Sequence, residues 1–222
     1  MEQRELWPNL EPAKNLGFVL YGGTAVALRY GHRQSVDFDF FSDKPLDQKL
    51  LSQKFPFIAD AHDVRPSPNT LNFDVPPKKP GGRFVKISFF GGIKWGRVGD
   101  PEVTNDGILQ VASPEDLLGN KVGVVLQRVA VKDYQDIAVM VRAGVSLARG
   151  FGSARAMYGQ QFNEIDTLRA LNYFQVGNLA ELSQEDKGTL TRAVRDIQKI
   201  PVVFRLADSL AISEMPGESK GS

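Results

Sequence analysis

The sequence predicts an α+β fold, with a sheet and short helices in its first half and helices in its second half. Short apolar runs typical of strands, separated by glycine, proline and polar residues, occur between residues 18 and 111. From Ser113 onward the pattern becomes helical. We therefore divide the chain into a core (1–112), a helical part (113–214) and a small, polar, disordered tail (215–222).

Composition narrows the classes of protein to consider. The 222 residues are 42% hydrophobic, which supports a packed core, and 27 basic against 26 acidic residues give a net charge of only +1. Any nucleic-acid or membrane partner must therefore be recognised by a local patch. The absence of cysteine excludes disulfides, zinc–thiolate sites and thiol catalysis. Because we find neither a signal peptide at residues 1–10 nor a run of about 20 apolar residues, we expect a cytoplasmic protein without membrane contact.

The first half alternates between predicted strands and helices. A strand is predicted over residues 18–21, a short helix over 24–30 and a second strand over 36–41, followed by a helix over 46–54. The segment 60–82 is rich in proline and polar residues, and the only strand predicted there covers 70–75. Two more strands are predicted over 83–90 and 107–111.

The second half begins with a recognisable helix start. Ser113, Pro114 and Asp116 follow the Ser-Pro-x-Asp pattern, in which the hydroxyl caps the helix and proline occupies its first turn. Further helices are predicted over 133–144, 163–174 and 183–200.

Two aspartates interrupt the apolar strand predicted over residues 36–41. Alternate side chains of a strand share a face, so Asp37 and Asp39 lie on one side and the phenylalanines beside them on the other. Their Cα atoms are then about 6.5 Å apart, close enough for both carboxylates to ligate one divalent cation or a pair of cations. Magnesium suits a site that has only oxygen ligands. The alternative is an edge strand with a solvated face, although aspartate is depleted in strands.

Gly22 and Gly23 lie between the first predicted strand and the helix after it. Glycine lets backbone amides approach a phosphate closely, and the helix N-terminus adds partial positive charge. Thr24 can cap this helix or contact the same phosphate. A tight strand-to-helix turn is the plainer alternative. The thirteen residues between Gly23 and Asp37 leave room for a short helix and a return strand, which brings the glycine turn beside the carboxylates.

The polar loop before the acidic strand carries His32 and Arg33. Arg33 can neutralise a polyphosphate, and His32 can stack on a base or bind phosphate. A solvated loop is the alternative for both residues, and we prefer it for His32.

The helix predicted from Ser113 onward carries two basic residues on its apolar side. At 100° per residue, Lys121 and Arg128 fall within the arc of the neighbouring leucines and valines. Burying such charges is costly unless they reach an anion or water, and snorkelling to the helix edge is the alternative. We interpret Lys121 as facing a ligand and leave both interpretations open for Arg128.

These residues resemble a known signature. Tyr21-Gly22-Gly23, thirteen residues and then Asp37-Phe38-Asp39-Phe40 resemble the DNA polymerase β-type nucleotidyltransferase superfamily. The full run from Gly22 to Phe41 is similar to its AbiEii/AbiGii toxin branch, and the resemblance extends over about residues 20–141. It implies a nucleotidyltransferase-type mixed sheet flanked by helices, with the helical part 113–214 completing the active site.

The stretch from Arg128 to Ile137 also resembles the toxin branch, in which a helical lysine precedes an arginine and then an Asp-x-x-Asp. The resemblance implies that Lys121 contacts nucleotide phosphates and that Asp133 or Asp136 assists at the active site. Because Asp133 is equally suited to cap a helix, we assign this role to Asp136.

One residue departs from the wider superfamily. Many members place a third carboxylate on a later central strand, where this chain offers Ser88. The group that deprotonates the acceptor hydroxyl is then open between Asp136 and hydroxide on the metal ion.

The resemblance implies a bacterial enzyme that moves a nucleoside monophosphate from an NTP to an RNA (tRNA) or protein acceptor and releases pyrophosphate. It also implies Mg²⁺ or Mn²⁺ and, as in a toxin of a type IV toxin–antitoxin or abortive-infection pair, an antitoxin partner. The predicted catalytic residues are Asp37, Asp39, Lys121 and Asp136, of which Asp37 and Asp39 hold the metal. The predicted nucleotide-binding residues are Gly22, Gly23, Thr24, Arg33, Lys121 and Arg128. A nucleotidyltransferase that modifies a small molecule such as an antibiotic, or a catalytically silent nucleotide-binding relative, is the alternative.

Overall fold

A computed structural model describes residues 2–212, so the tail predicted over 215–222 lies outside the described residues. Seven strands of this range form one sheet. They are β1 (Val19–Tyr21), β2 (Phe38–Phe41), β3 (His62–Ser67), β4 (Thr70–Val75), β5 (Val85–Phe90), β6 (Glu102–Val103) and β7 (Gln110–Val111). Their order is β3-β4-β5-β2-β1-β7-β6. The β2–β5 and β1–β7 pairs are parallel and the other pairs antiparallel, which confirms a mixed sheet.

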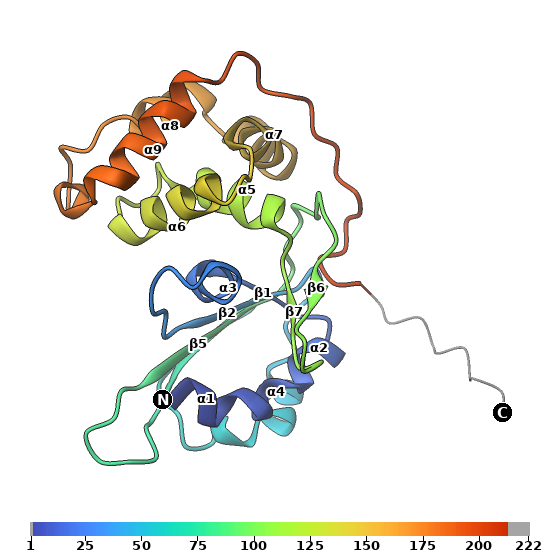
Figure 1. Cartoon of the computed structure of the whole chain (residues 1–222). Helices are drawn as coiled ribbons and strands as arrows, with labels where there is room; N and C mark the ends of the chain where they lie inside the picture. The colour runs from blue at the N-terminus through green and yellow to red at the C-terminus, as the bar shows by residue number, and fades with distance from the viewer. Residues whose placement is uncertain (1, 213–222) are drawn as a thin grey trace, which may run out of the picture.

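Helices flank this sheet on both faces (Figure 1). Those of the first half are α1 (Glu2–Leu6), α2 (Pro12–Asn15), α3 (Gly22–Tyr30) and α4 (Gln48–Lys54), with 3-10 helices η1 (Trp7–Leu10) and η2 (Pro56–Ile58). Those of the second half are α5 (Pro114–Val124), α6 (Val131–Arg142), α7 (Leu147–Tyr158), α8 (Glu164–Ala170) and α9 (Gln184–Arg195), with η3 (Gly159–Gln161) and η4 (Leu179–Glu181). In Figure 1, α3 lies between the sheet and the helices of the second half, whereas α1, α2 and α4 lie under the opposite face. The predicted α+β class is confirmed.

One part of the core lies on the face of the sheet that turns away from Asp39. Phe38 and Phe40 of β2 are almost fully buried there, and Phe40 stacks on Phe89 of β5 with ring centroids 5.1 Å apart. Phe55, directly after α4, contacts Phe89 from the side of the covering helices at 5.1 Å. Burying such side chains contributes about 1.5–3 kcal/mol each, so β2 is fixed in register mainly by its apolar face.

The predicted start of the second half is confirmed. Ser113 precedes α5, and its hydroxyl accepts a hydrogen bond from the backbone N–H of Asp116 at 3.0 Å while Pro114 occupies the first turn. The three later helices predicted from the sequence are also present as α6, α8 and α9; α6 begins and ends two residues earlier than predicted, and α8 and α9 are shorter.

Several elements were not predicted, among them the short helices α1 and α2, strand β6, helix α7 and strand β3. Helix α7 carries Gly150 and Gly152, which weaken the helical signal of its sequence. Gly150 is nevertheless required, because a Cβ there would lie 2.5 Å from Leu118 of α5. Strand β3 is exposed along its whole length and contains Pro66, which within sheets is tolerated mainly in edge strands. Its sequence therefore has no alternation of apolar and polar residues and is typical of an irregular segment.

After α9 the chain returns to the sheet. Ala207 forms an isolated antiparallel bridge with Arg97, and Gln110 of β7 exchanges two hydrogen bonds with Ile212. Figure 1 shows this segment running from the helices back towards β6 and β7. None of the helices within residues 2–212 has the length and apolar content needed to cross a membrane.

Candidate active site

Asp37 and Asp39 lie close together where β2 begins. Asp39 is in the strand, whereas Asp37 lies just before it, one correction to the strand predicted over residues 36–41. Phe38 is only 1% exposed and turns into the core, and the charge of Asp37 acts on the carboxylate of Asp39, so the two aspartates lie near each other. Asp39 pairs across the sheet with Ser88 of β5, the position where a third carboxylate was sought.

The two carboxylates have an unfavourable electrostatic environment. Burial raises the pKa of Asp39, and the negative charge of Asp37 raises it further. The charge of Lys121 and a hydrogen bond from Ser88 act in the opposite direction without cancelling the rise. Within residues 2–212, no hydrogen bond or ion pair reaches the carboxylate of Asp37. A cation bound between the two aspartates would remove both penalties.

The donor set of this pair fits a hard divalent cation. Among the described residues there is no group of three or more His, Cys, Asp or Glu side chains suited to hold a metal ion. Asp37 and Asp39 would therefore supply two oxygen ligands, and phosphate oxygens and water the others. Magnesium is commonly held in this way beside a phosphate substrate, by one or two carboxylates.

The turn formed by Gly22 and Gly23 lies directly beside Asp39. Gly22 has a φ of +70°, and a Cβ there would lie 2.3 Å from Oδ2 of Asp39. A Cβ at Gly23 would lie 2.2 Å from the guanidinium of Arg33. Helix α3 starts at Gly22 without a side-chain cap, so the amides of its first turn are available to an anion beside Asp39.

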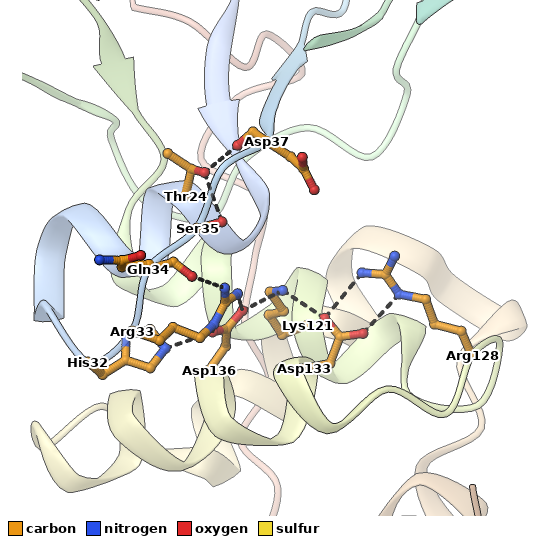
Figure 2. Close-up of polar contacts among 10 residues, drawn as sticks. All are labelled: Thr24, His32, Arg33, Gln34, Ser35, Asp37, Lys121, Arg128, Asp133 and Asp136. Carbon is orange, nitrogen blue, oxygen red and sulfur yellow. Dashed lines mark hydrogen bonds and ion pairs between the residues drawn. The ribbon is translucent and has the colours of Figure 1, made fainter. Parts of the chain in front are cut away.

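One of the two roles predicted for Thr24 is wrong. It does not cap α3, whose N-cap residue is Tyr21. Its buried hydroxyl instead donates to the backbone carbonyl of Asp37 and lies 2.9 Å from Oγ of Ser35 (Figure 2). Thr24 thus holds the loop that carries Asp37, and phosphate binding by this side chain stays a prediction.

A cluster of charged side chains involves α5 and α6, and its Lys121 faces Asp39 across a cleft. Lys121 is 4% exposed, and its Nζ lies 2.7 Å from both Asp133 and Asp136. Figure 2 shows the lysine between the two carboxylates. Because an ammonium group has three donors, two are occupied here and one is left for a ligand.

Asp136 is enclosed by its partners. One oxygen accepts from Arg33 and from His32 at 2.7 Å each, and the other accepts from Arg33 at 2.9 Å and from Lys121. Burial alone would raise the pKa of Asp136, but these hydrogen bonds and the charge of Lys121 hold it well below the usual range. A carboxylate with such a low pKa accepts a proton poorly. The solvated loop expected for His32 is wrong, since its side chain is 9% exposed.

Arg128 and Asp133 form the outer part of the cluster. Helix α5 ends at Val124, so Arg128 lies beyond it and its predicted position on that helix is wrong. The guanidinium pairs with Asp133 at 2.8 and 3.1 Å, and the Arg128 side chain is 65% exposed. The alternative role of Asp133 as a helix cap is also wrong, because the N-cap residue of α6 is Ala130.

A cleft of about 470 Å³ opens between the sheet and the second-half helices, and it contains part of the predicted site. Its lining includes Gly22 and Asp39 from the sheet side and Lys121 and Arg128 from the helix side. Thr24 and Arg33 instead line a separate hollow of about 400 Å³. The arrangement can hold a metal ion and a polyphosphate between opposite walls.

The remaining lining of the cleft was not predicted from the sequence. It consists mainly of aromatic and amide side chains: Phe41, Phe90, Trp95, Asn120, Gln127, Tyr158 and Gln161. Tyr158 ends α7, the helix that was missed. One sequence signal points to it: Gly119 and Gly123 of α5 are four residues apart, a spacing that lets another helix approach closely.

Comparisons with known proteins find a related sequence and similar folds. A protein of Aquifex aeolicus with no characterised function is 34% identical over 147 residues, covering 64% of this chain and 66% of that protein. A proposed nucleotidyltransferase from H. pylori has a similar structure, with a TM-score of 0.56 at 16% identity over 87% of this chain and 92% of the other. MenT4, a nucleotidyltransferase toxin from Mycobacterium tuberculosis, has a TM-score of 0.60 at 11% identity over 88% and 82%. At these identities the two structures show the fold alone.

The family assignment is given by the sequence profile of the AbiEii nucleotidyltransferase toxins of type IV toxin–antitoxin systems, which matches residues 9–201. That range contains the two aspartates, the glycine turn and the charged cluster, and the chain therefore belongs to the AbiEii nucleotidyltransferase family.

Proposed function

We propose that the chain transfers a nucleoside monophosphate from an NTP to a hydroxyl group of an RNA or protein acceptor, with Mg²⁺ or Mn²⁺ held by Asp37 and Asp39. The observation that carries the proposal is the opposition of Asp39 and Gly22 to Lys121 and Arg128 across one cleft. The carboxylates suit a metal ion, and the amides and cations suit a polyphosphate. When bound, the metal ion supplies positive charge to the phosphate oxygens.

The residues of the chain contribute mainly position and charge. The first-turn amides of α3, exposed by Gly22, hold phosphate oxygens close to Asp39. Lys121 keeps one N–H donor free of its two carboxylate partners and neutralises charge as pyrophosphate leaves. Arg128, whose side chain is 65% exposed, adds a second cation to the lining of the cleft.

The proton of the acceptor hydroxyl needs a base on the sheet side. Ser88 is not basic at neutral pH, and Asp136 is fully paired at a low pKa. Because Asp37 and Asp39 are assigned to the metal ion, we assign no side chain of the described residues to this step.

The first test is labelled-NTP transfer by an Asp39→Asn variant, in the presence and absence of magnesium. We expect magnesium-dependent labelling by the wild-type protein and none above background by the variant. Asp60→Asn, which changes an exposed aspartate outside the cleft, is the matched control and should keep full activity. Full transfer by Asp39→Asn would show that this mechanism is wrong.

The labelled product identifies the acceptor class. Total RNA, cell protein and an aminoglycoside are each incubated with the enzyme and every NTP. Label on RNA or protein supports the proposal, and label only on the antibiotic supports a small-molecule transferase instead. We further propose an antitoxin partner, on the basis of the family, which predicts growth arrest on expression that depends on Asp39.

A further inference from the structure

The cleft has two chemically different ends. Gly22, Asp39, Lys121 and Arg128 form a charged end, and Phe41, Phe90, Trp95 and Tyr158 form an aromatic wall. Only the charged end is used by the proposed phosphate chemistry. The aromatic wall, as defined by these four residues, has no role so far.

The wall starts directly beside the charged end. Phe41 follows Asp39 by two residues in β2, so it lies on the same face of the sheet, about 6.6 Å further along. The neighbouring strand repeats the arrangement, since Ser88 pairs with Asp39 and Phe90 pairs with Phe41. On both strands an aromatic side chain thus follows a polar one by two residues.

The rings of the wall form a continuous series. Phe41 stacks on Phe90 with centroids 4.7 Å apart and contacts Trp95 at 5.5 Å. Trp95 meets Tyr158 edge to face at 5.4 Å, which joins the sheet side of the cleft to α7. All four rings are only partly buried, so part of each ring faces the cleft.

The fold clears space for the last ring of the series. A Cβ at Gly123 of α5 would lie 2.2 Å from the ring of Tyr158. The Tyr158 hydroxyl accepts a hydrogen bond from Asn120, also of α5, at 2.9 Å. The tyrosine is therefore fixed at the cleft by a glycine on one side and an amide on its hydroxyl.

We infer that the aromatic wall is the binding site for the nucleobase of the NTP, with Trp95 and Phe41 as its stacking surface. Aromatic stacking accepts every base, because each has a π face. The amides of Asn120, Gln127 and Gln161 border the same cleft and can read the hydrogen-bonding edge of the base. The inference rests on the proposed use of an NTP, but it assigns a part of the cleft that the transfer chemistry does not need.

The chain has two tryptophans, which provides an optical test. Trp7 lies outside the cleft, so a Trp7→Phe protein keeps Trp95 as its only indole. We titrate this protein with the magnesium complexes of ATP, CTP, GTP and UTP and with ribose 5-triphosphate, which lacks only the base. The expected result is quenching of Trp95 by at least one NTP and none by ribose 5-triphosphate at saturation.

Calorimetry on wild type and variants supplies the affinities. Stacking is expected to make the NTP bind about 5- to 150-fold more tightly than ribose 5-triphosphate. Trp95→Ala should remove most of that difference without changing the affinity for ribose 5-triphosphate. Phe204→Ala, which removes an 80% exposed ring outside the cleft, is the matched control and should change neither value.

The outcomes separate the two proposals. NTP binding without quenching of Trp95, or equal affinity for the NTP and ribose 5-triphosphate, overturns the base site and leaves the proposed function intact. Binding of neither compound overturns both. If Trp95→Ala does not fold, the Trp7→Phe titration still decides, because it retains every ring of the wall.

Discussion

The molecule carries two pairs of aspartates, one at β2 and one on α6, in opposite electrostatic states. Asp37 and Asp39 on the sheet have no cation in direct contact within the described chain, and burial and mutual repulsion raise the pKa of Asp39. Asp133 and Asp136 on α6 are surrounded by cationic side chains, and the pKa of Asp136 is lowered. The first pair requires a positive charge from outside the chain, whereas the second pair already has it.

This difference distinguishes carboxylates suited to bind a ligand from carboxylates that hold the structure together. A carboxylate that is left unneutralised in a folded protein costs stability and is retained where a ligand compensates for it. A carboxylate with several donors instead fixes the groups around it. Asp136 joins the loop with Arg33 to α5 with Lys121, so it holds these two parts of the chain together.

The largest effect is expected when Asp37, a member of the pair at β2, is replaced by a neutral residue. Asp37→Asn should lower nucleotide transfer by at least about 10³-fold, or about 4 kcal/mol of transition-state stabilisation, because the metal ion loses one of its two protein ligands. The free energy of unfolding without metal should not fall, since the substitution removes a repulsion. Steady-state transfer and urea unfolding measure the two quantities. A variant with activity within tenfold of wild type would contradict the assignment of Asp37.

Replacing Asp136, a member of the pair on α6, by a neutral residue should instead lower the stability of the fold. Asp136→Asn is expected to lower the free energy of unfolding by about 3 kcal/mol, because Arg33 and Lys121 lose a fully buried partner. Urea unfolding measures the loss. Asp196→Asn serves as control, since Asp196 pairs with Arg195 at the surface, where such pairs contribute about 0.5 kcal/mol or less. An unchanged stability would mean that the cluster does not hold the two parts together.

The two aspartate pairs should also differ in how stability depends on pH, with effects smaller than those above. In metal-free protein the raised pKa of Asp39 makes it destabilising at pH 7, and this penalty decreases as the pH falls through that pKa and vanishes below the unfolded value of 3.8. The lowered pKa of Asp136 gives stability that is fully present above 3.8 and is lost only as the pH falls towards the folded pKa. At pH 7, Asp39→Asn should therefore be more stable than wild type, and Asp136→Asn less stable.

Thermal or urea unfolding between pH 7 and pH 4 measures these differences. The gain of Asp39→Asn should shrink on acidification over that range, whereas the loss of Asp136→Asn should persist. A gain that does not change with pH would argue against a raised pKa at Asp39 as its cause.

The sequence predicted the parts of the site that local rules determine. Alternation along a strand correctly turned Phe38 and Phe40 into the core and away from Asp39, and the glycine turn was expected at Gly22, whose φ is +70°. The start of α5 at Ser113 followed from capping preferences. Each of these depends on a few consecutive residues.

What depended on long-range packing was missed. Helix α7 was hidden because Gly150 weakens its helical signal, and only the presence of Leu118 on another helix explains that glycine. The missed helix carries Tyr158, so the aromatic wall could not be assembled from the sequence. Arg33 was known to be near the site, but its partner Asp136 is 103 residues away, and no spacing rule connects them.

The smallest expected effect concerns Arg128, the exposed member of the paired cluster. Lys121 and Arg128 both bind Asp133, but their side chains are 5% and 65% exposed, so only the lysine pair is protected from water. Arg128→Ala should therefore change the free energy of unfolding by less than about 1 kcal/mol. It should still weaken binding of the magnesium–NTP complex by a few-fold, increasingly at low salt, because an exposed guanidinium can turn from Asp133 to a phosphate.

Lys121→Met, measured beside it by calorimetry and urea unfolding, should impair both binding and stability. If Arg128→Ala lost as much stability as Lys121→Met, burial would not be what distinguishes the two cations, and the separation of a structural cation from a ligand-binding one would fail.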